Sequence, residues 1–233
     1  MKFAVLVFPG TWSERDCHYV LTHEMGQQAD LVWHRASDLD GYDAVVIPGG
    51  FSYGDHLRTG AIARFSPVMD AVVRHAAAGK PAIGICNGFQ ILCESHLLPG
   101  VLMRNDSLEF RCMPTHLRIE NANTIFTRAG REGDVLTIPI SHGEGNYYAD
   151  DDTIARLEDE RRVVFRYVTP QGDATPGANP NGSVHNIAGI INERGNVLGM
   201  MPHPERSSEP LMGGVDGQVV WRSMVENAVA ATA

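Results

Sequence analysis

The sequence is poor in cysteine, in basic residues and in long apolar runs. Only four of its 233 residues are cysteine, which is too few for a disulfide framework and indicates a reducing compartment. Lysine and arginine number 19 against 28 aspartate and glutamate residues, and this excess of acid disfavours nucleic-acid binding through charge alone. The first apolar run, Phe3–Phe8, is too short for a signal peptide or a membrane span. We therefore expect a cytoplasmic protein that binds neither nucleic acid nor a membrane.

The rest of the composition is typical of a globular protein. Hydrophobic residues make up 43% and charged residues 20%, so a chain of this length can bury a large core. The sequence has no internal repeat and no linker-like tract. We expect one domain over residues 1–233.

The first hundred residues alternate between strand-like and helix-like apolar patterns. The strand candidates are short continuous runs: Phe3–Phe8, Leu31–His34, Asp43–Ile47 and Pro81–Ile85. Ser13 is expected to cap one helix, and Pro67 to begin another. Their predicted apolar faces are Cys17, Val20, Leu21 and Met25 in the first helix, and Met69, Val72, Val73 and Ala76 in the second. A third helix is expected over Asn87–His96.

The second half of the chain is richer in strands and turns. Its strand candidates are His116–Ile119, Val135–Ile140, Val163–Val168, Ile187–Ile191 and Val197–Met201. A last helix is expected around Gly217–Val229, and the long Pro/Gly/Asn-rich loop at Asp173–Ser183 is a candidate functional loop. Together the two halves predict an α/β fold: an open, mostly parallel sheet with helices on both faces and antiparallel strands added at its edge.

Cys86 lies in a Gly-x-Cys-x-Gly pattern between a predicted strand and a predicted helix. Such a pattern is typical of a nucleophile elbow, in which glycines permit a sharp turn that projects the side chain from the sheet. The following helix N-terminus would favour a thiolate. By itself, the pattern fits equally well a buried cysteine that simply ends a strand.

His203 and Glu205 follow the last predicted strand. A thiolate that attacks an amide needs a proton donor for the departing amine, and His203 can supply it while Glu205 orients the imidazole. Alone, this segment also fits an ordinary polar loop. Gly49-Gly50 follows another strand, and its backbone N–H, with that of Asn87, is a candidate oxyanion hole, although two glycines also fit a plain turn. The carboxyl ends of parallel strands share one rim, so these segments are expected to meet.

Two further polar residues, His142 and Glu144, also follow a predicted strand. They are candidates for lining the pocket or a partner surface, and no further ligands have the spacing of a metal site. Cys93 is expected in the core.

Three segments together resemble the class I, or triad, glutamine amidotransferases: Gly49–Asp55 (GGFSYGD), Gly84–Gln90 (GICNGFQ) and Met201–Arg206 (MPHPER). Within that class, the chain is similar to the glutaminase subunits of phosphoribosylformylglycinamidine synthase in three more segments: Pro139–Tyr147 (PISHGEGNY), Asn179–Ser183 (NPNGS) and Asn186–Ile190 (NIAGI). The resemblance runs from Phe3 to the final helix. Thr59 departs from it, standing where a cysteine is expected outside the triad.

The resemblance implies a flavodoxin-like α/β domain with a catalytic triad of Cys86, His203 and Glu205. It places Gly50 and Asn87 near the oxyanion and Gln90 in the glutamine pocket. Glutamine would be hydrolysed through a thioester on the cysteine. The ammonia would pass to a separate ATP-dependent synthetase subunit, which converts formylglycinamide ribonucleotide to formylglycinamidine ribonucleotide in purine biosynthesis.

The same resemblance implies a small bridging subunit as a second partner. No metal or cofactor is expected on this chain, and ATP and Mg²⁺ are expected on the synthetase subunit. The sequence has no Gly-x-x-x-x-Gly-Lys-Ser/Thr segment for a nucleotide phosphate.

Three alternatives remain at this point. The chain could be a glutaminase that serves another synthetase. It could belong to the protease- and chaperone-like family that shares this sheet and elbow cysteine, although Asn87 stands where those proteins usually have histidine. It could also be a catalytically silent binding module, although an intact set of Cys86, His203 and Glu205 disfavours that.

Overall fold

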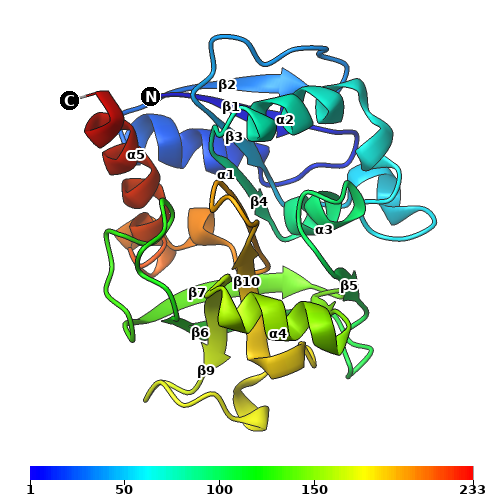
Figure 1. The fold of residues 1–233 in the computed structure, drawn as a ribbon, viewed down its shortest axis with the longest axis vertical. Coiled ribbons are helices and arrows are strands. Elements are labelled where there is room, and N and C mark those ends of the chain that lie inside the picture. The colour runs from blue at the N-terminus through cyan, green and yellow to red at the C-terminus, as the bar shows by residue number, and fades with distance from the viewer. Residues whose placement is uncertain (233) are drawn as a thin grey trace.

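A nine-stranded sheet organises the molecule, in the order β2-β1-β3-β4-β11-β10-β9-β6-β7 (Figure 1). The computed structural model describes residues 1–232, with side chains as far as residue 226. The parallel strands are β1 (Lys2–Val7), β2 (Gln28–Trp33), β3 (Ala44–Ile47), β4 (Ala82–Ile85) and β11 (Val197–Met200). Antiparallel pairing then adds β10 (Ile187–Ile191), β9 (Val163–Val168), β6 (Arg111–Ile119) and β7 (Val135–His142). A separate antiparallel pair joins β5 (Val101–Met103) to β8 (Asn146–Tyr148).

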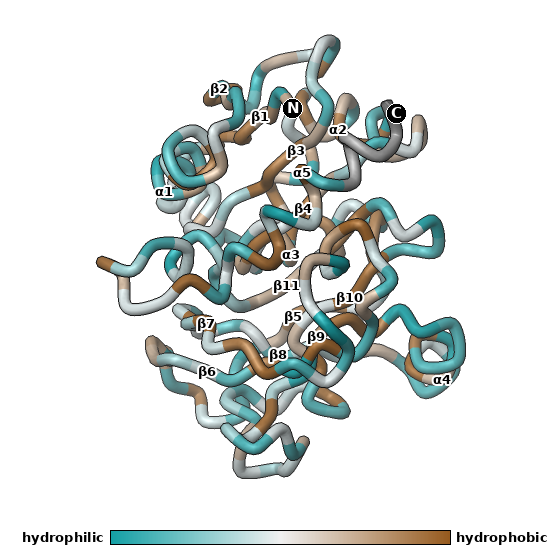
Figure 2. The backbone as a smooth tube through the Cα atoms, turned by 90° about the vertical axis from the view of Figure 1, so that its left-hand side faces the viewer, coloured by the Kyte–Doolittle hydropathy of each residue, from teal (hydrophilic) through white to brown (hydrophobic). Residues whose placement is uncertain are grey.

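Helices cover both faces of this sheet. They are α1 (Glu14–Tyr19), which continues into a π-helical turn at Val20–Glu24, α2 (Pro67–Ala77), α3 (Asn87–Glu94), α4 (Asp151–Asp159) and α5 (Gln218–Thr232). Helices α1 and α2 lie on opposite sides of the parallel strands (Figures 1 and 2). The predicted α/β class, with its parallel sheet and added antiparallel strands, is confirmed.

Burial of the central strands explains why the sequence shows continuous apolar runs there. All residues of β3, β4 and β11 are buried, since each strand has a neighbour on both edges and is covered on both faces. Figure 2 shows these strands as the hydrophobic interior of the molecule. The edge strand β2 instead has only exposed and half-buried residues.

Two local predictions in the first half are wrong. Ser13 precedes α1 but its side chain does not cap the helix, because its backbone (φ −98°, ψ 10°) is not extended; its Oγ instead accepts a hydrogen bond from Arg206 Nη2 at 2.9 Å. Val73 is 41% exposed, because it lies one residue round the helix from the buried face of α2.

Three elements were absent from the sequence-based prediction. Helix α4 is short and strongly charged, with few buried positions, so its apolar periodicity is weak; it begins at an N-cap, Asp150, that accepts from Thr153 N at 2.9 Å. Strands β5 and β8 have three residues each and pair only with one another, which leaves little pattern to detect.

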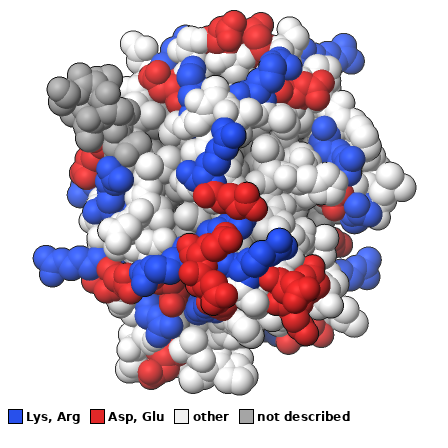
Figure 3. All heavy atoms as spheres, viewed as in Figure 1, with Lys and Arg blue, Asp and Glu red and all other residues white. Residues whose placement is uncertain are grey.

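The surface agrees with the acidic composition. On the face shown in Figure 3, basic and acidic side chains are interspersed, and no broad basic area is visible there. In the described part of the chain, no helix combines the length and the apolar character that crossing a bilayer requires.

Candidate active site

Cys86 stands at the turn between β4 and α3, in a strained backbone conformation. Its φ of 52° and ψ of −105° are rare for a residue with a side chain, and such strain concentrates at functional sites. Its N–H donates to Met200 O at 2.8 Å, which ties the turn to the end of β11. The side chain is 5% exposed. This is the geometry of the predicted nucleophile elbow.

The glycines around Cys86 are required by close packing. A Cβ on Gly84 would lie 2.5 Å from Gly88 O, and one on Gly88 would overlap the Ile47 carbonyl of β3. A Cβ on Gly49 would lie 2.7 Å from His203 Cε1 and 3.4 Å from Cys86 Cβ. Gly49 therefore lies against both side chains, so residues far apart in the sequence meet at one rim of the sheet.

His203 and Glu205 form a buried pair beside the cysteine. His203 Nδ1 and Glu205 Oε1 are 2.6 Å apart, and both residues are almost fully buried. The backbone N–H of His203 donates to Pro139 O at 2.8 Å, and this hydrogen bond anchors the pair to β7. His203 Nε2 is buried without a hydrogen-bond partner, which leaves it free to exchange a proton with the thiol or a substrate.

Within this pair, the Glu205 carboxylate and the His203 imidazolium each stabilise the charged form of the other. Burial alone would lower the pKa of His203, but the Glu205 carboxylate, and after it Cys86, outweigh burial and raise that pKa above its usual range. Burial alone would likewise raise the pKa of Glu205, yet the charge and hydrogen bond of His203 lower it. The pair therefore holds a proton on the imidazole, as a group that protonates a leaving amine must.

The two predicted oxyanion donors come from the loop after β3, at Gly50, and from the first residue of α3, Asn87. Gly50 has a φ of 152°, and a Cβ there would lie 2.7 Å from Trp12 N. Hydrogen bonds from Phe51 N to Gly10 O and from Trp12 N to Gly49 O fix the Gly49-Gly50 turn without using the Gly50 N–H. Asn87 is the first residue of α3, where a backbone N–H has no partner within the helix. Both amides are thus available to an anion.

A cavity of about 180 Å³ opens beside the sulfur. Its wall includes Cys86 and Gln90, and its other lining residues come from the loop after β3, from Phe110 just before β6, and from the end of β7 with the loop that follows it. Gln90 spans the cavity floor: its Nε2 donates to Glu144 O at 2.6 Å, and its Oε1 accepts from Asn87 Nδ2 at 2.8 Å. The predicted pocket residue therefore lies in this cavity, and a side-chain amide of a substrate would meet the thiol within it.

Sequence reasoning assigned no role to three residues that line this cavity, Asp55, Thr59 and Phe110. Thr59, which stands outside the predicted triad, lines the cavity, and its Oγ1 donates to Glu144 Oε2 at 3.1 Å. Asp55 also lines it; burial, and after that the charge of Glu144, raise the pKa of Asp55 to about 6. Asp55 ends the segment Gly49–Asp55 and Thr59 follows it closely. Their position in the sequence, near the predicted oxyanion glycines, was the signal that could have identified them.

Comparison with known proteins gives this geometry a context. Residues 1–230 match the CobB/CobQ-like glutamine amidotransferase domain. The chain belongs to this glutamine amidotransferase family.

Individual relatives of this amidotransferase domain are similar over almost their whole length. The phosphoribosylformylglycinamidine synthase subunit PurQ of Moorella thermoacetica is 58% identical over 226 residues, covering 97% of this chain and 96% of that protein. The subunit of the same name from Gloeobacter violaceus is 56% identical over 230 residues, covering 99% of each. A chain in the structure of PurLQS from Thermotoga maritima superposes with a TM-score of 0.86 at 41% identity, over 97% of this chain and 98% of that one.

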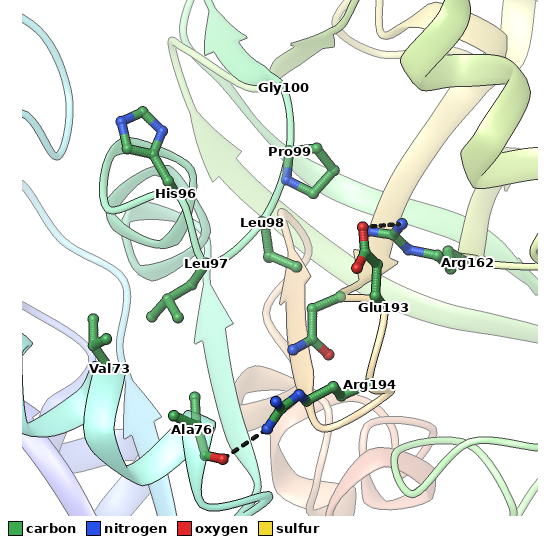
Figure 4. A pocket seen from close by; sticks show the side chains of 12 residues that line it. Val73, Ala76, His96, Leu97, Leu98, Pro99, Gly100, Arg162, Glu193 and Arg194 are labelled. Atoms are coloured by element: carbon green, nitrogen blue, oxygen red, sulfur yellow. Dashed lines mark hydrogen bonds and ion pairs between the residues drawn. The ribbon is translucent and has the colours of Figure 1, made fainter.

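A larger cavity, of about 490 Å³, has no contribution from Cys86 to its lining; Figure 4 shows the side chains that line it. It is lined by the end of α2, the segment after α3, Arg162 just before β9 and the β10–β11 turn. Because this turn precedes β11, which runs parallel to β4, it lies at the other end of the central strands from Cys86. Its charged groups are paired within the protein: Arg194 Nη1 donates to Ala77 O at 2.7 Å, and Arg162 Nη1 to Glu160 Oε2 at 2.9 Å. We therefore place the chemistry in the smaller cavity.

Proposed function

We propose that this chain is the glutaminase subunit of a phosphoribosylformylglycinamidine synthase. The observation that carries the glutaminase activity is the strained Cys86 elbow packed, across Gly49, against the buried His203–Glu205 pair. The choice of synthase is supported by relatives of that name, 58% and 56% identical over nearly the whole chain.

In the first half of the reaction, the Cys86 thiolate attacks the side-chain carbonyl carbon of glutamine. The carbonyl oxygen becomes an oxyanion, which the Gly50 and Asn87 N–H groups stabilise. His203 gives a proton to the amide nitrogen, the C–N bond breaks, and ammonia leaves. A glutamyl thioester remains on the cysteine, while Glu205 holds the imidazole in orientation.

In the second half, water attacks the thioester. His203 takes a proton from the water, the C–S bond breaks, and glutamate leaves as the cysteine is regenerated. The chain needs no cofactor for either step, because both are proton transfers and acyl transfers. We place ATP and Mg²⁺ on the partner.

The ammonia is consumed on another chain. The partners are an ATP-dependent synthetase subunit, which converts formylglycinamide ribonucleotide to formylglycinamidine ribonucleotide, and a small bridging subunit. The similarity to a chain of the PurLQS structure supports this assembly. We place the complex in the cytoplasm, in keeping with four free cysteines, one of them exposed.

The decisive variant is Cys86→Ala in the complex reconstituted with both partners. Glutamine-dependent synthesis should fall by about 10⁴-fold or more, because no thioester can form, whereas synthesis from added ammonia should continue at the wild-type rate. Cys112→Ala is the matched control: it removes an exposed cysteine from β6 and should leave both rates unchanged. Full glutamine-dependent activity in Cys86→Ala would contradict the proposal.

A further inference from the structure

His142 is a buried histidine beside the active site that the proposed reaction does not use. It ends β7, is 3% exposed and lines the cavity next to the sulfur. Burial, and after it the charge of His203, lower the pKa of His142 to about 3, so its ring is neutral at physiological pH. A neutral ring has one donor nitrogen and one acceptor nitrogen.

The hydrogen bonds of the ring identify which nitrogen is which. Asn181 Nδ2 can only donate; besides its shorter bonds to Gly145 O and Tyr167 Oη, it makes a long contact of 3.5 Å with His142 Nε2, which agrees with Nε2 as the acceptor. His142 Nδ1 then carries the proton and donates to Asn105 Oδ1 at 3.2 Å. The tautomer is therefore set by two asparagines, both of which are fully buried.

The same two asparagines hold the backbone that follows His142. Asn105 Oδ1 accepts from Gly145 N at 3.0 Å, and Asn181 Nδ2 donates to Gly145 O at 2.9 Å. Asn105 Nδ2 also donates to the His142 carbonyl at 3.0 Å. Gly145 lies against the ring itself, since a Cβ there would come within 2.5 Å of His142 Nδ1. The segment 141–145 is thus fixed at both of its ends.

That segment supplies two carbonyls to the active site. Ser141 O accepts from Cys86 Sγ at 3.6 Å, and Glu144 O accepts from Gln90 Nε2 at 2.6 Å. From Gln90 the hydrogen bonds continue to Asn87, whose Oδ1 accepts from Ser52 N at 3.1 Å, next to the Gly49-Gly50 loop. A continuous chain of hydrogen bonds therefore joins the segment 141–145, helix α3 and the loop that contains Gly49 and Gly50.

We propose that His142 is a positioning residue for glutamine binding. Its neutral ring contacts Asn105 on one side and Asn181 on the other. Through these contacts it keeps the segment 141–145 at the distance from Cys86 at which the cavity can bind the side-chain amide of glutamine. This role rests on the proposed glutaminase function. It assigns a purpose to Asn181 as well, which lies in the long loop at 173–183 and ties that loop to the active site.

The test compares His142→Ala with His142→Asn in the reconstituted complex. Displacing a cavity wall should raise the KM for glutamine by about ten-fold to a hundred-fold in His142→Ala, with a smaller change in kcat. In His142→Asn the amide nitrogen replaces Nδ1–H as the donor to Asn105, so the KM should recover part of the way towards wild type. The matched control is His75→Ala, which removes another buried histidine, on α2 and outside this cavity, and should leave the KM unchanged.

Two readouts separate positioning from general loss of structure. Alkylation of Cys86 by iodoacetamide and synthesis from added ammonia do not need the cavity to grip glutamine. Both should stay within about three-fold of wild type in His142→Ala if only substrate positioning is lost. A merely structural role would lower these rates and the glutamine-dependent rate together, with a matching fall in the folded fraction measured by circular dichroism.

An unchanged KM in His142→Ala, or a proportional fall in all readouts, would overturn the role of His142 while leaving the glutaminase intact. A wild-type complex whose glutamine-dependent synthesis does not require Cys86 would overturn the proposed function, and the role of His142 with it.

Discussion

The two cavities, which lie at opposite ends of the central strands, differ in more than size. The one between α2 and the β10–β11 turn has about 490 Å³, against about 180 Å³ beside Cys86. In the larger cavity, the guanidinium groups of Arg162 and Arg194 donate to protein oxygens. Among the described residues that line the smaller cavity, Asp55 has a buried Oδ1 without a partner, and the His203–Glu205 pair, which packs against Gly49 next to Cys86, adds two more unpartnered atoms, His203 Nε2 and Glu205 Oε2.

The difference indicates that groups which lower the stability of the fold are collected near Cys86, whereas the charged groups around the larger cavity are paired. Unpaired buried polar atoms and the positive φ of Cys86 each lower the stability of the folded state, and their concentration around Cys86 is typical of a functional site, although unpaired buried atoms also occur elsewhere, at Glu14 and Trp221. Paired charges around the larger cavity need no such explanation. Volume alone would have chosen the wrong cavity.

The largest effect that tests this contrast is expected from His203→Ala. It removes the proton donor for the leaving amine, so glutamine-dependent synthesis should fall by about 10³-fold or more, while ammonia-dependent synthesis is unchanged. Steady-state rates of the complex with each nitrogen source measure both. A fall of less than about ten-fold would show that the buried His–Glu pair is structural.

A smaller effect is expected from Asp55→Asn on stability. Because the pKa of Asp55 is raised to about 6 in the folded state, its ionisation opposes folding as the pH rises from the unfolded pKa, near 3.8, through 6. The variant should therefore be more stable than wild type at pH 8 by about 1 kcal/mol, a value reduced for partial solvent screening, and equally stable at pH 3. Urea unfolding at the two pH values measures the difference. The same difference at both pH values would contradict an origin in charge.

The smallest effect is expected from Arg194→Ala, in the larger cavity. It removes a surface hydrogen bond to Ala77 O at the end of α2, so the free energy of unfolding should fall by about 0.5–1.5 kcal/mol. Glutamine-dependent synthesis should stay within about two-fold of wild type. A loss of activity comparable to that of His203→Ala would remove the functional contrast between the two cavities.

Much of the fold was predictable because its signals are local. The buried strands β1, β3, β4 and β11 appear as continuous apolar runs close to their observed bounds, and Pro67 marks the start of α2. Helix α4 and the β5–β8 pair escaped prediction because their stability comes from contacts with distant segments rather than from a strong pattern of their own.

Only part of the candidate site could be predicted from the sequence. Cys86, His203 and Glu205 each follow a strand, and the shared rim of a parallel sheet brings them together. Their assignment as a triad stays a prediction. The roles of Asn105 and Asn181 were not predictable, because each acts through hydrogen bonds to residues about 40 positions away, such as Asn105 to Gly145 and Asn181 to His142. Ser141 contributes a backbone carbonyl, which carries no side-chain signal at all.

The central claim, that Cys86 is the nucleophile, is tested most directly by intact-mass measurement of the chain quenched in acid during turnover with glutamine. Acylation predicts a species heavier by one glutamyl group, localised to the peptide that contains Cys86 and absent from Cys86→Ala. A wild-type chain that turns over glutamine with no such adduct, or with the adduct on another residue such as Cys93, would contradict the account.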